Sequence, residues 1–227
     1  DWPSHSSLFG IIDLAGLPKD RYYLYRSHWN KNEETLHILP HWTWNGREGE
    51  VTPVFVYTNY PSAELFINGK SQGVRTKDLS VTVHNSGDSL SVANLKRQQR
   101  YRLMWMDTVY EPGTVKVVAY DAEGNAVAHK EIHTAGRPHH IELEADRTNI
   151  KADGNDLSFV TVKVVDKDGN LCPMADNEII FKVKGAGSYC AGANGDPVSL
   201  ESFQEPHMHV FSGMMTAIVS SSEEPGD

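Results

Sequence analysis

Two tryptophans one residue apart are the side chains in this 227-residue chain best suited to bind a ligand. Trp42 and Trp44 stand in the tetrapeptide His41-Trp42-Thr43-Trp44, and in an extended segment residues two apart point to the same side. The C–H faces of sugars stack on indole rings, while sugar hydroxyls take polar partners. The pair therefore fits a sugar-contacting platform or the wall of an active site. It also fits packing between two structural elements, and the sequence leaves both interpretations open.

Eleven histidines raise the question of a metal site. The sharpest pattern is His207-Met208-His209, because a strand would place both imidazole rings on one face. No third or fourth ligand lies nearby in the sequence, so surface histidines are the better interpretation. Two acidic stretches, 153–156 and 166–170, resemble calcium loops, yet neither supplies the full set of oxygen ligands and both fit ordinary hairpin turns. We predict no metal site and no cofactor.

The acidic side chains and the cysteines offer little catalytic chemistry. The 30 Asp and Glu residues fall mostly in turns or at alternating strand positions, which is typical of solvated surface charge. The sequence contains no glycine-rich phosphate loop, no Gly-x-Ser-x-Gly elbow and no Cys-x-x-Cys pair. Cys172 and Cys190 flank an expected strand, and two separate thiols are the default interpretation, with a bridge left for geometry to decide. We therefore assign no catalytic residue in this chain.

The composition and net charge of the chain exclude some classes of binding partner. Hydrophobic residues make up 39% of the chain and charged residues 22%, a globular composition long enough for two domains. The net charge of -9 gives no basic surface to hold phosphates, so nucleic acid is not an expected partner. No apolar run approaches the ~18 residues of a membrane-spanning helix, so we expect no membrane partner either.

One helix is predicted near the start of the chain. Pro18 fits the first helical position, where its missing N–H would be unpaired in any case. From Lys19 to about Trp29, the rings of Tyr22, Tyr25 and Trp29 fall at i, i+3 and i+7, on one face. Such a short helix cannot bury this aromatic face against itself, so it needs a partner. We expect the helix to be poorly ordered, or to pack on the β-structure that follows it in this chain or on a neighbouring molecule.

The chain changes to period-two alternation after residue 34, which predicts β-structure. Asn68-Gly69 between apolar runs is the strongest hairpin signal. The alternating runs predict strands at 54–57, 63–67, 80–83, 101–105 and 114–120. Five to seven short strands in about a hundred residues are typical of an immunoglobulin or fibronectin type β-sandwich. We predict this first sandwich over residues 35–135 and no sustained helical period after the first segment.

Gly136-Arg137-Pro138 interrupts the alternation and fits an interdomain hinge. A second β-series begins at 140–144, and Val160, Val162 and Val164 share one face of its next strand. We predict a second immunoglobulin-like sandwich over residues 136–227. Its last apolar run precedes a polar turn that would suit a further strand. We therefore expect this sandwich to lack its last strand and to leave an unpaired edge.

Several long segments carry a family resemblance. They are WPSHSSLFGIIDLAGLPKDRYYLYRSHW at 2–29, LHILPHWTW at 36–44, AELFINGKSQG at 63–73, YEPGTVKVVAYDAEGN at 110–125 and ADGNDLSFVTVKVVDKDGNLCPMADNEIIFKVKGAG at 152–187. The chain resembles the end of the catalytic (β/α)8 barrel and the following β-sandwich domains of glycoside hydrolase family 2, in the branch of bacterial β-galactosidases. The resemblance implies a mostly β fold of two immunoglobulin-like or fibronectin-like sandwiches in tandem. Residues 1–34 would be a loop and helix remnant of the barrel.

The resemblance also implies a role. In that family both catalytic carboxylates are glutamates of earlier barrel segments, so this chain would be a non-catalytic C-terminal accessory part of a retaining enzyme that hydrolyses terminal β-glycosidic bonds. Its partner would be its own upstream barrel, and carbohydrate would reach it only through that parent, in the periplasm or outside the cell. By this resemblance, Trp2 and His5 would precede the last barrel helix in a loop near the rim of the substrate pocket. With Trp42 and Trp44 they are the candidate substrate-binding residues.

Two other classes of protein are compatible with the sandwich pattern. An independent carbohydrate-binding module would require Trp42 and Trp44 to be exposed and coplanar. A bacterial surface or adhesion protein can consist of immunoglobulin-like domains alone. Neither class needs a barrel-closing loop and helix at residues 1–34, so that segment favours the glycosidase.

Overall fold

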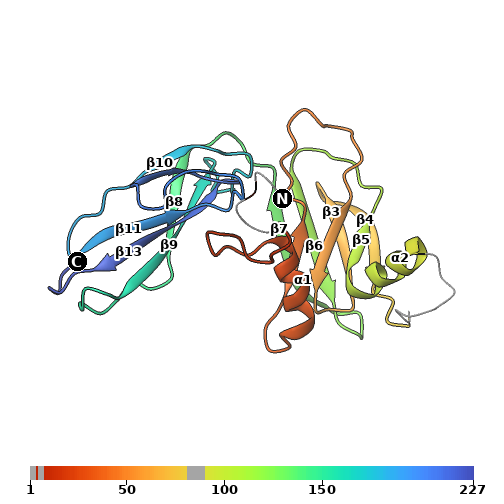
Figure 1. Ribbon diagram of the computed structural model, residues 1–227. Helices are drawn as coiled ribbons and strands as arrows, with labels where there is room; N and C mark the ends of the chain where they lie inside the picture. The colour runs from red at the N-terminus through yellow and green to blue at the C-terminus, as the bar shows by residue number, and fades with distance from the viewer. Residues whose placement is uncertain (1–3, 5–7, 81–89) are drawn as a thin grey trace. The chain divides into compact units, whose positions relative to one another are not determined.

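The computed structural model describes Ser4, residues 8–80 and residues 90–227 (Figure 1). By their contacts these residues form two compact units, one of residues 20–134 and one that joins the described residues up to Lys19 to residues 135–227. The described chain is mostly β, as predicted, with two short helices. Within it, neither helix has the length and apolar character needed to cross a membrane.

The unit of residues 20–134 contains the first β-sandwich. One antiparallel sheet has the order β1-β2-β5, with β1 at Leu36–Leu39, β2 at Val54–Thr58 and β5 at Leu103–Trp105. The other has the order β4-β3-β6-β7, with β3 at Ser62–Ile67, β4 at Lys70–Thr76, β6 at Thr114–Tyr120 and β7 at Ala126–His133. The inward-facing residues of the two sheets pack against each other in one core. This arrangement confirms the predicted fold class. The largest fully buried side chains of this core are Trp42, Trp105, Tyr110, Leu65 and Leu103.

The Asn-Gly turn joins β3 to β4 as the hairpin prediction requires. Asn68 and Gly69 both have positive φ, 49° and 78°, the combination that a type I′ turn needs. Glycine adopts this backbone without steric cost, and asparagine tolerates it. Ile67 pairs with Lys70 directly across the turn, so the hairpin places β3 beside β4 in the four-stranded sheet.

A second helix, α2 at Leu90–Tyr101, contradicts the expectation of no helical period after the first segment. Its sequence is rich in leucine, lysine, arginine and glutamine, which favour helix. It lacks the continuous apolar stripe of a buried helix, since even Leu95 is 50% exposed. The strand expected at 101–105 therefore begins only at Leu103. In the strand expected at 80–83, positions 81–83 lie outside the described residues.

The second sandwich has one sheet of four strands and one of two. The large sheet has the order β11-β13-β9-β8, with β8 at His140–Ala145, β9 at Leu157–Val165, β11 at Gly187–Ala193 and β13 at Met214–Ser221. The small sheet pairs β10 at Glu178–Ile180 with β12 at His207–His209. Val162 and Met215 lie at the centre of the core between the sheets, and both are 0% exposed.

The segment before the first helix packs on the second sandwich. The hydroxyl of Thr216 in β13 donates a buried 2.8 Å hydrogen bond to the carbonyl of Ala15. The Asp13 carboxylate holds the loop in shape by accepting the N–H groups of Ala15 and Leu17, each at 2.9 Å. The predicted barrel remnant at residues 1–34 is thus shared between the two compact units. Its origin in a barrel stays a prediction, as do the domain boundaries at 35, 136 and 227.

The first helix, α1 at Asp20–Trp29, packs on β1 and β2 of the first sandwich. Tyr23 stacks on His37 of β1 with ring centroids 3.9 Å apart, and the Asp20 carboxylate lies 2.7 Å from Nε2 of that histidine. His28 Nε2 is 3.1 Å from the carbonyl of Tyr101. The helix therefore packs on the first sandwich, one of the expected outcomes, but through Tyr23 and His28; on the predicted aromatic face, Trp29 stays 75% exposed.

Candidate functional site

Trp42, the first candidate sugar platform, belongs to the core of the first sandwich. Its side chain is 1% exposed, and its ring meets Tyr110 edge to face with centroids 5.2 Å apart. Its Nε1 donates a 2.9 Å hydrogen bond to the carbonyl of Glu111. A ring enclosed in this way has no face for a sugar, so the structure supports the packing interpretation for Trp42.

Trp44 lies partly buried at the edge of the same core. His41 stacks on its ring with centroids 4.2 Å apart, and the Arg47 guanidinium lies 5.2 Å from the ring centroid. Its Nε1 donates to the carbonyl of His41 at 2.9 Å. Burial lowers the pKa of His41 and favours its neutral form at pH 7. The described structure therefore brings Trp42 and Trp44 into one corner of the fold but not into an exposed coplanar pair.

Trp2 and His5 lie outside the described residues. Their proposed contact with substrate, like that of Trp44, stays a prediction about the longer protein.

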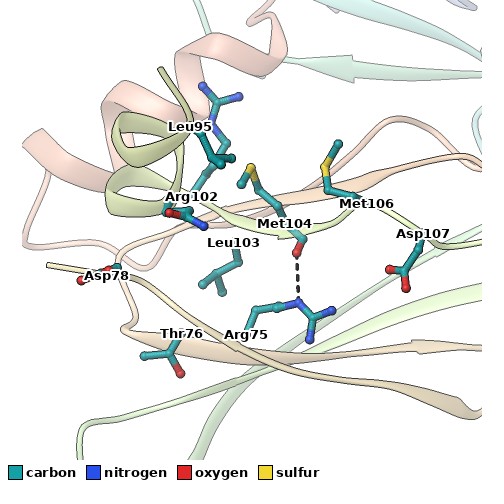
Figure 2. A pocket seen from close by; sticks show the side chains of 10 residues that line it. Arg75, Thr76, Asp78, Leu95, Arg102, Leu103, Met104, Met106 and Asp107 are labelled. Atoms are coloured by element: carbon teal, nitrogen blue, oxygen red, sulfur yellow. Dashed lines mark hydrogen bonds between the residues drawn. The ribbon is translucent and has the colours of Figure 1, made fainter. Parts of the chain in front are cut away.

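A cleft of about 340 Å³ opens between β4, α2 and β5 of the first sandwich (Figure 2). Sequence reasoning missed it because one wall is the unexpected helix. Its lining combines six side chains that can form hydrogen bonds with four apolar ones. The polar ones are Arg75, Thr76, Asp78, Gln99, Arg102 and Asp107, and the apolar ones are Leu95, Leu103, Met104 and Met106.

Arg75 is held in place at the floor of this cleft. Its Nε donates to the carbonyl of Met104 at 3.2 Å (Figure 2) and its Nη1 to that of Val74 at 3.3 Å. The guanidinium lies 6.0 Å from the centroid of the buried Trp105 ring. Among the described residues no carboxylate pairs with Arg75, so its remaining N–H donors stay available to a ligand.

The carboxylates of the cleft differ in their surroundings. Asp78 accepts hydrogen bonds from the N–H and the hydroxyl of Ser80, so it stabilises its own turn. Asp107 is exposed, and its carboxylate has no hydrogen bond or ion pair to any described residue. Arg75 and Asp107 therefore offer a free donor and a free acceptor beside the thioether chains of Met104 and Met106. This chemistry suits a small polyhydroxylated ligand such as a saccharide.

The two histidines of β12 each pair with a different carboxylate. His207 Nδ1 lies 3.1 Å from Glu178, and His209 Nδ1 lies 2.8 Å from Glu201. The hydrogen bond that the His209 ring donates to the Glu201 carboxylate raises the pKa of His209. In the part of the chain that the structure describes, no group of three or more His, Cys, Asp or Glu side chains is arranged to hold a metal ion.

Asp166 shows what the calcium-like stretches do in this fold. Its carboxylate accepts N–H groups of Asp168 and Asn170 within its turn, at 2.9 Å each, and that of Gly136 at 2.7 Å. Burial raises the pKa of Asp166, but these hydrogen bonds outweigh burial and hold the pKa well below its ordinary value. The carboxylate thus ties the turn after β9 to the start of the second sandwich.

The two cysteines are separate thiols, as the default interpretation predicted. Cys172 is buried in the core of the second sandwich, and Cys190 is exposed on β11. Neither thiol is part of a disulfide.

Comparison with family models shows two matches in this chain. Residues 141–227 match glycoside hydrolase family 2 C-terminal domain 5, and residues 49–128 match a domain of unknown function, DUF4982.

Curated relatives that match most of this chain are much longer than it is. β-Galactosidase BoGH2A of Bacteroides ovatus is 45% identical over 225 residues, which are 99% of this chain and 24% of that protein. A putative β-glucuronidase of Formosa agariphila is 31% identical over 86% of this chain and 17% of its own length. This chain therefore spans about a quarter or less of the relatives that it matches.

Solved structures also match nearly all of this chain with a part of a longer protein. A β-glycosidase from Bacteroides vulgatus superposes with a TM-score of 0.83 at 32% identity, over 99% of this chain and 26% of that one. A glycosyl hydrolase family 2 member from Bacteroides cellulosilyticus gives a TM-score of 0.79 at 29% identity, over 96% and 29%. Both the fold and the sequence of this chain are thus found as one part of larger enzymes.

Proposed function

Since this chain corresponds to the C-terminal region of glycoside hydrolase family 2 enzymes, we propose that it is the non-catalytic accessory part of a longer retaining β-glycosidase of the β-galactosidase type. The main support for the proposal is the match with BoGH2A. The match includes 99% of this chain but only 24% of the length of BoGH2A. The catalytic carboxylates would lie in the remaining length. Periplasmic or extracellular action of the longer enzyme stays a prediction.

The partner proposed for this chain is its own upstream catalytic barrel, and α1 offers a contact surface for it. Tyr25 and Trp29 stack on each other with centroids 4.7 Å apart and are 37% and 75% exposed. Exposed aromatic pairs of this kind are enriched in protein interfaces. The contacts of Tyr23 and His28 hold the opposite side of α1 on the first sandwich. The helix would therefore present the pair to the barrel on a rigid support.

The activity of the chain tests the proposal directly. The purified chain should not hydrolyse a nitrophenyl β-galactoside, whereas the longer natural protein should, because a retaining mechanism needs two carboxyl groups roughly 5–5.5 Å apart. Turnover by this chain, abolished by one substitution among its own carboxylates, would overturn the proposal. An inactive longer protein with a folded barrel would refute the β-galactosidase assignment alone.

A second candidate function is saccharide binding at the cleft between β4, α2 and β5. The free N–H groups of Arg75 and the free carboxylate of Asp107 favour it. Calorimetric titration with galactosides and with glucuronides would test it, with Arg75→Met and Asp107→Asn as binding variants. Arg47→Met, which alters another arginine of the same unit, is the matched control. Binding that survives both cleft variants would place the saccharide elsewhere.

A further inference from the structure

A cleft of about 290 Å³ lies in the unit of the second sandwich, between the segment before α1 and the loop at 194–203 that follows β11. Its apolar side chains are Leu14 from the segment and Leu200 and Phe203 from the loop. These are 43%, 84% and 51% exposed, so their apolar surface is open to solvent. The loop also brings polar side chains to the cleft. An apolar surface beside a few fixed polar groups is the usual composition of a small-molecule site.

Glu201 holds this loop in one shape. Its Oε1 accepts the N–H of His209 at 3.0 Å and lies 2.8 Å from Nδ1 of that ring. Its Oε2 accepts hydrogen bonds from the hydroxyl of Ser199 at 3.1 Å and from the side-chain amide of Asn194 at 3.3 Å. Asn194 is 4% exposed and also donates to the carbonyl of His209 at 2.9 Å. Because the loop is already fixed by these bonds, little further ordering is needed when it binds a ligand.

The segment and the loop come together at Gly195. A Cβ at this position would lie 2.2 Å from Oδ2 of Asp13, so only glycine lets the segment approach the loop this closely. Asp13 shapes the turn that carries Leu14, and the carbonyl of Ala15 accepts the buried hydrogen bond from Thr216. Leu14 is therefore fixed beside the loop within one compact unit.

Asp196 provides the free hydrogen-bond acceptor of this cleft. Its Oδ1 accepts the N–H of Val198 at 2.9 Å, and its Oδ2 has no hydrogen bond or ion pair to any described residue. Among the described residues that line the cleft there is no Lys, Arg or His side chain. The cleft can therefore accept hydrogen bonds from a ligand, and its charge disfavours an anion.

We propose that this cleft binds one ring of a neutral saccharide. Hydroxyl groups of the sugar donate hydrogen bonds to Asp196, and the C–H face of the ring packs on Phe203 and Leu200. Leu14 provides further apolar contact from the segment. The site belongs to the second sandwich and differs from the cleft of Arg75, and it does not depend on the catalytic role of the longer protein.

Titration of the isotope-labelled chain with methyl β-galactoside, followed by amide NMR shifts, tests the site. The amides at 194–203 should shift saturably, with a dissociation constant on the order of 1–10 mM, as a small ligand with few polar contacts gives. The corresponding glucuronide should bind at least about 10-fold more weakly, because its carboxylate meets Asp196. The absence of a saturable shift at 194–203 would overturn the proposal, as would equal or tighter binding of the glucuronide. Binding of butylamine without binding of the galactoside would identify an ammonium site, and the proposal would be wrong.

Two variants test the polar and the apolar contact separately. Asp196→Asn keeps an oxygen for the N–H of Val198 but removes the charge, and it should raise the dissociation constant about 10-fold. Phe203→Ala should raise the dissociation constant roughly 3- to 10-fold. The matched controls are Asp168→Asn, an exposed carboxylate, and Phe159→Ala, a 44% exposed ring, both outside the cleft in the same unit. The controls should leave binding unchanged, and unchanged binding in both cleft variants would refute the site.

Arg75→Met distinguishes this site from saccharide binding in the first sandwich. The variant should leave the amide shifts at 194–203 as they are in the wild type. If those shifts disappeared in Arg75→Met, the saccharide would bind in the other cleft and the proposal would be overturned. Glycosidase assays of the longer protein report independently on the proposed function.

Discussion

The two sandwiches differ in how completely their sheets cover each other. In the first, a three-stranded sheet faces a four-stranded sheet, and the core includes Trp42 and Trp105, at 1% and 0% exposure. In the second, the four-stranded sheet faces a sheet of β10 and β12 alone within the described residues, and β8 is exposed along its whole length. Apolar alternation is therefore present in both units, but it produces burial only where a second sheet lies opposite.

Truncation of a fully buried tryptophan in the first sandwich should give the largest effect. Trp105→Ala should destabilise this unit by about 3–5 kcal/mol, because it opens a large cavity and removes the 2.9 Å hydrogen bond to the carbonyl of Gly73. Urea unfolding followed by circular dichroism measures the change. A shift in the second sandwich of equal size would show that the two units unfold as one.

Met215→Ala makes the corresponding test in the second sandwich. Met215 is 0% exposed at the centre of that core, so its truncation should cost about 2–5 kcal/mol. Leu143→Ala is the matched control from the uncovered strand and should cost less than about 0.5 kcal/mol. If urea unfolding gave the same loss of stability for Met215→Ala and Leu143→Ala, the difference in burial between the core centre and β8 would not explain stability.

Asp166→Ala should give a smaller loss that depends on pH. It leaves the N–H groups of Gly136, Asp168 and Asn170 without their acceptor, at a cost of about 1–3 kcal/mol. The native pKa lies below the ordinary value, so this stabilisation is present above pH about 4 and is lost as the pH falls below it. Wild-type and variant stabilities, measured by thermal unfolding, should converge in acid. If the stability difference between wild type and Asp166→Ala were the same at low pH, the ionised Asp166 carboxylate would not be its source.

Trp29→Ser should have the smallest effect on the chain itself. The ring is 75% exposed, so the unfolding free energy should change by no more than about 0.5 kcal/mol. In the longer protein the same substitution should weaken the contact of α1 with the barrel, which thermal unfolding of the catalytic domain measures. Ser27→Ala, a buried site on the same helix, is the control that should act in both proteins. No effect of Trp29→Ser in the longer protein would remove the proposed interface.

Local patterns predicted most of the secondary structure. The hairpin at Asn68-Gly69 follows from two residues that accept positive φ, and α1 lies within one residue of its expected bounds. The alternating valines of β9 lie on its inner face as expected. These features depend on backbone sterics and on side-chain period, which neighbouring residues alone determine.

The candidate sites depended on contacts between distant residues. The position of Trp42 was ambiguous in the sequence, since a ring that suits a sugar suits a core equally well, and only the carbonyl of Glu111 and the ring of Tyr110 decided for the core. The cleft around Arg75 was missed because it needs α2, whose exposed surface gives no apolar period.

The β class, the two-sandwich organisation and the resemblance to family 2 glycosidases followed from local residue patterns along the chain. The hydrogen bond from Thr216 to the carbonyl of Ala15, 201 residues away, and the exposure of β8 could be found only from the folded arrangement. Long-range pairing and coverage depend on which surfaces meet in space. The alternation of residues along a strand indicates which of its faces is apolar. It does not indicate what packs against that face.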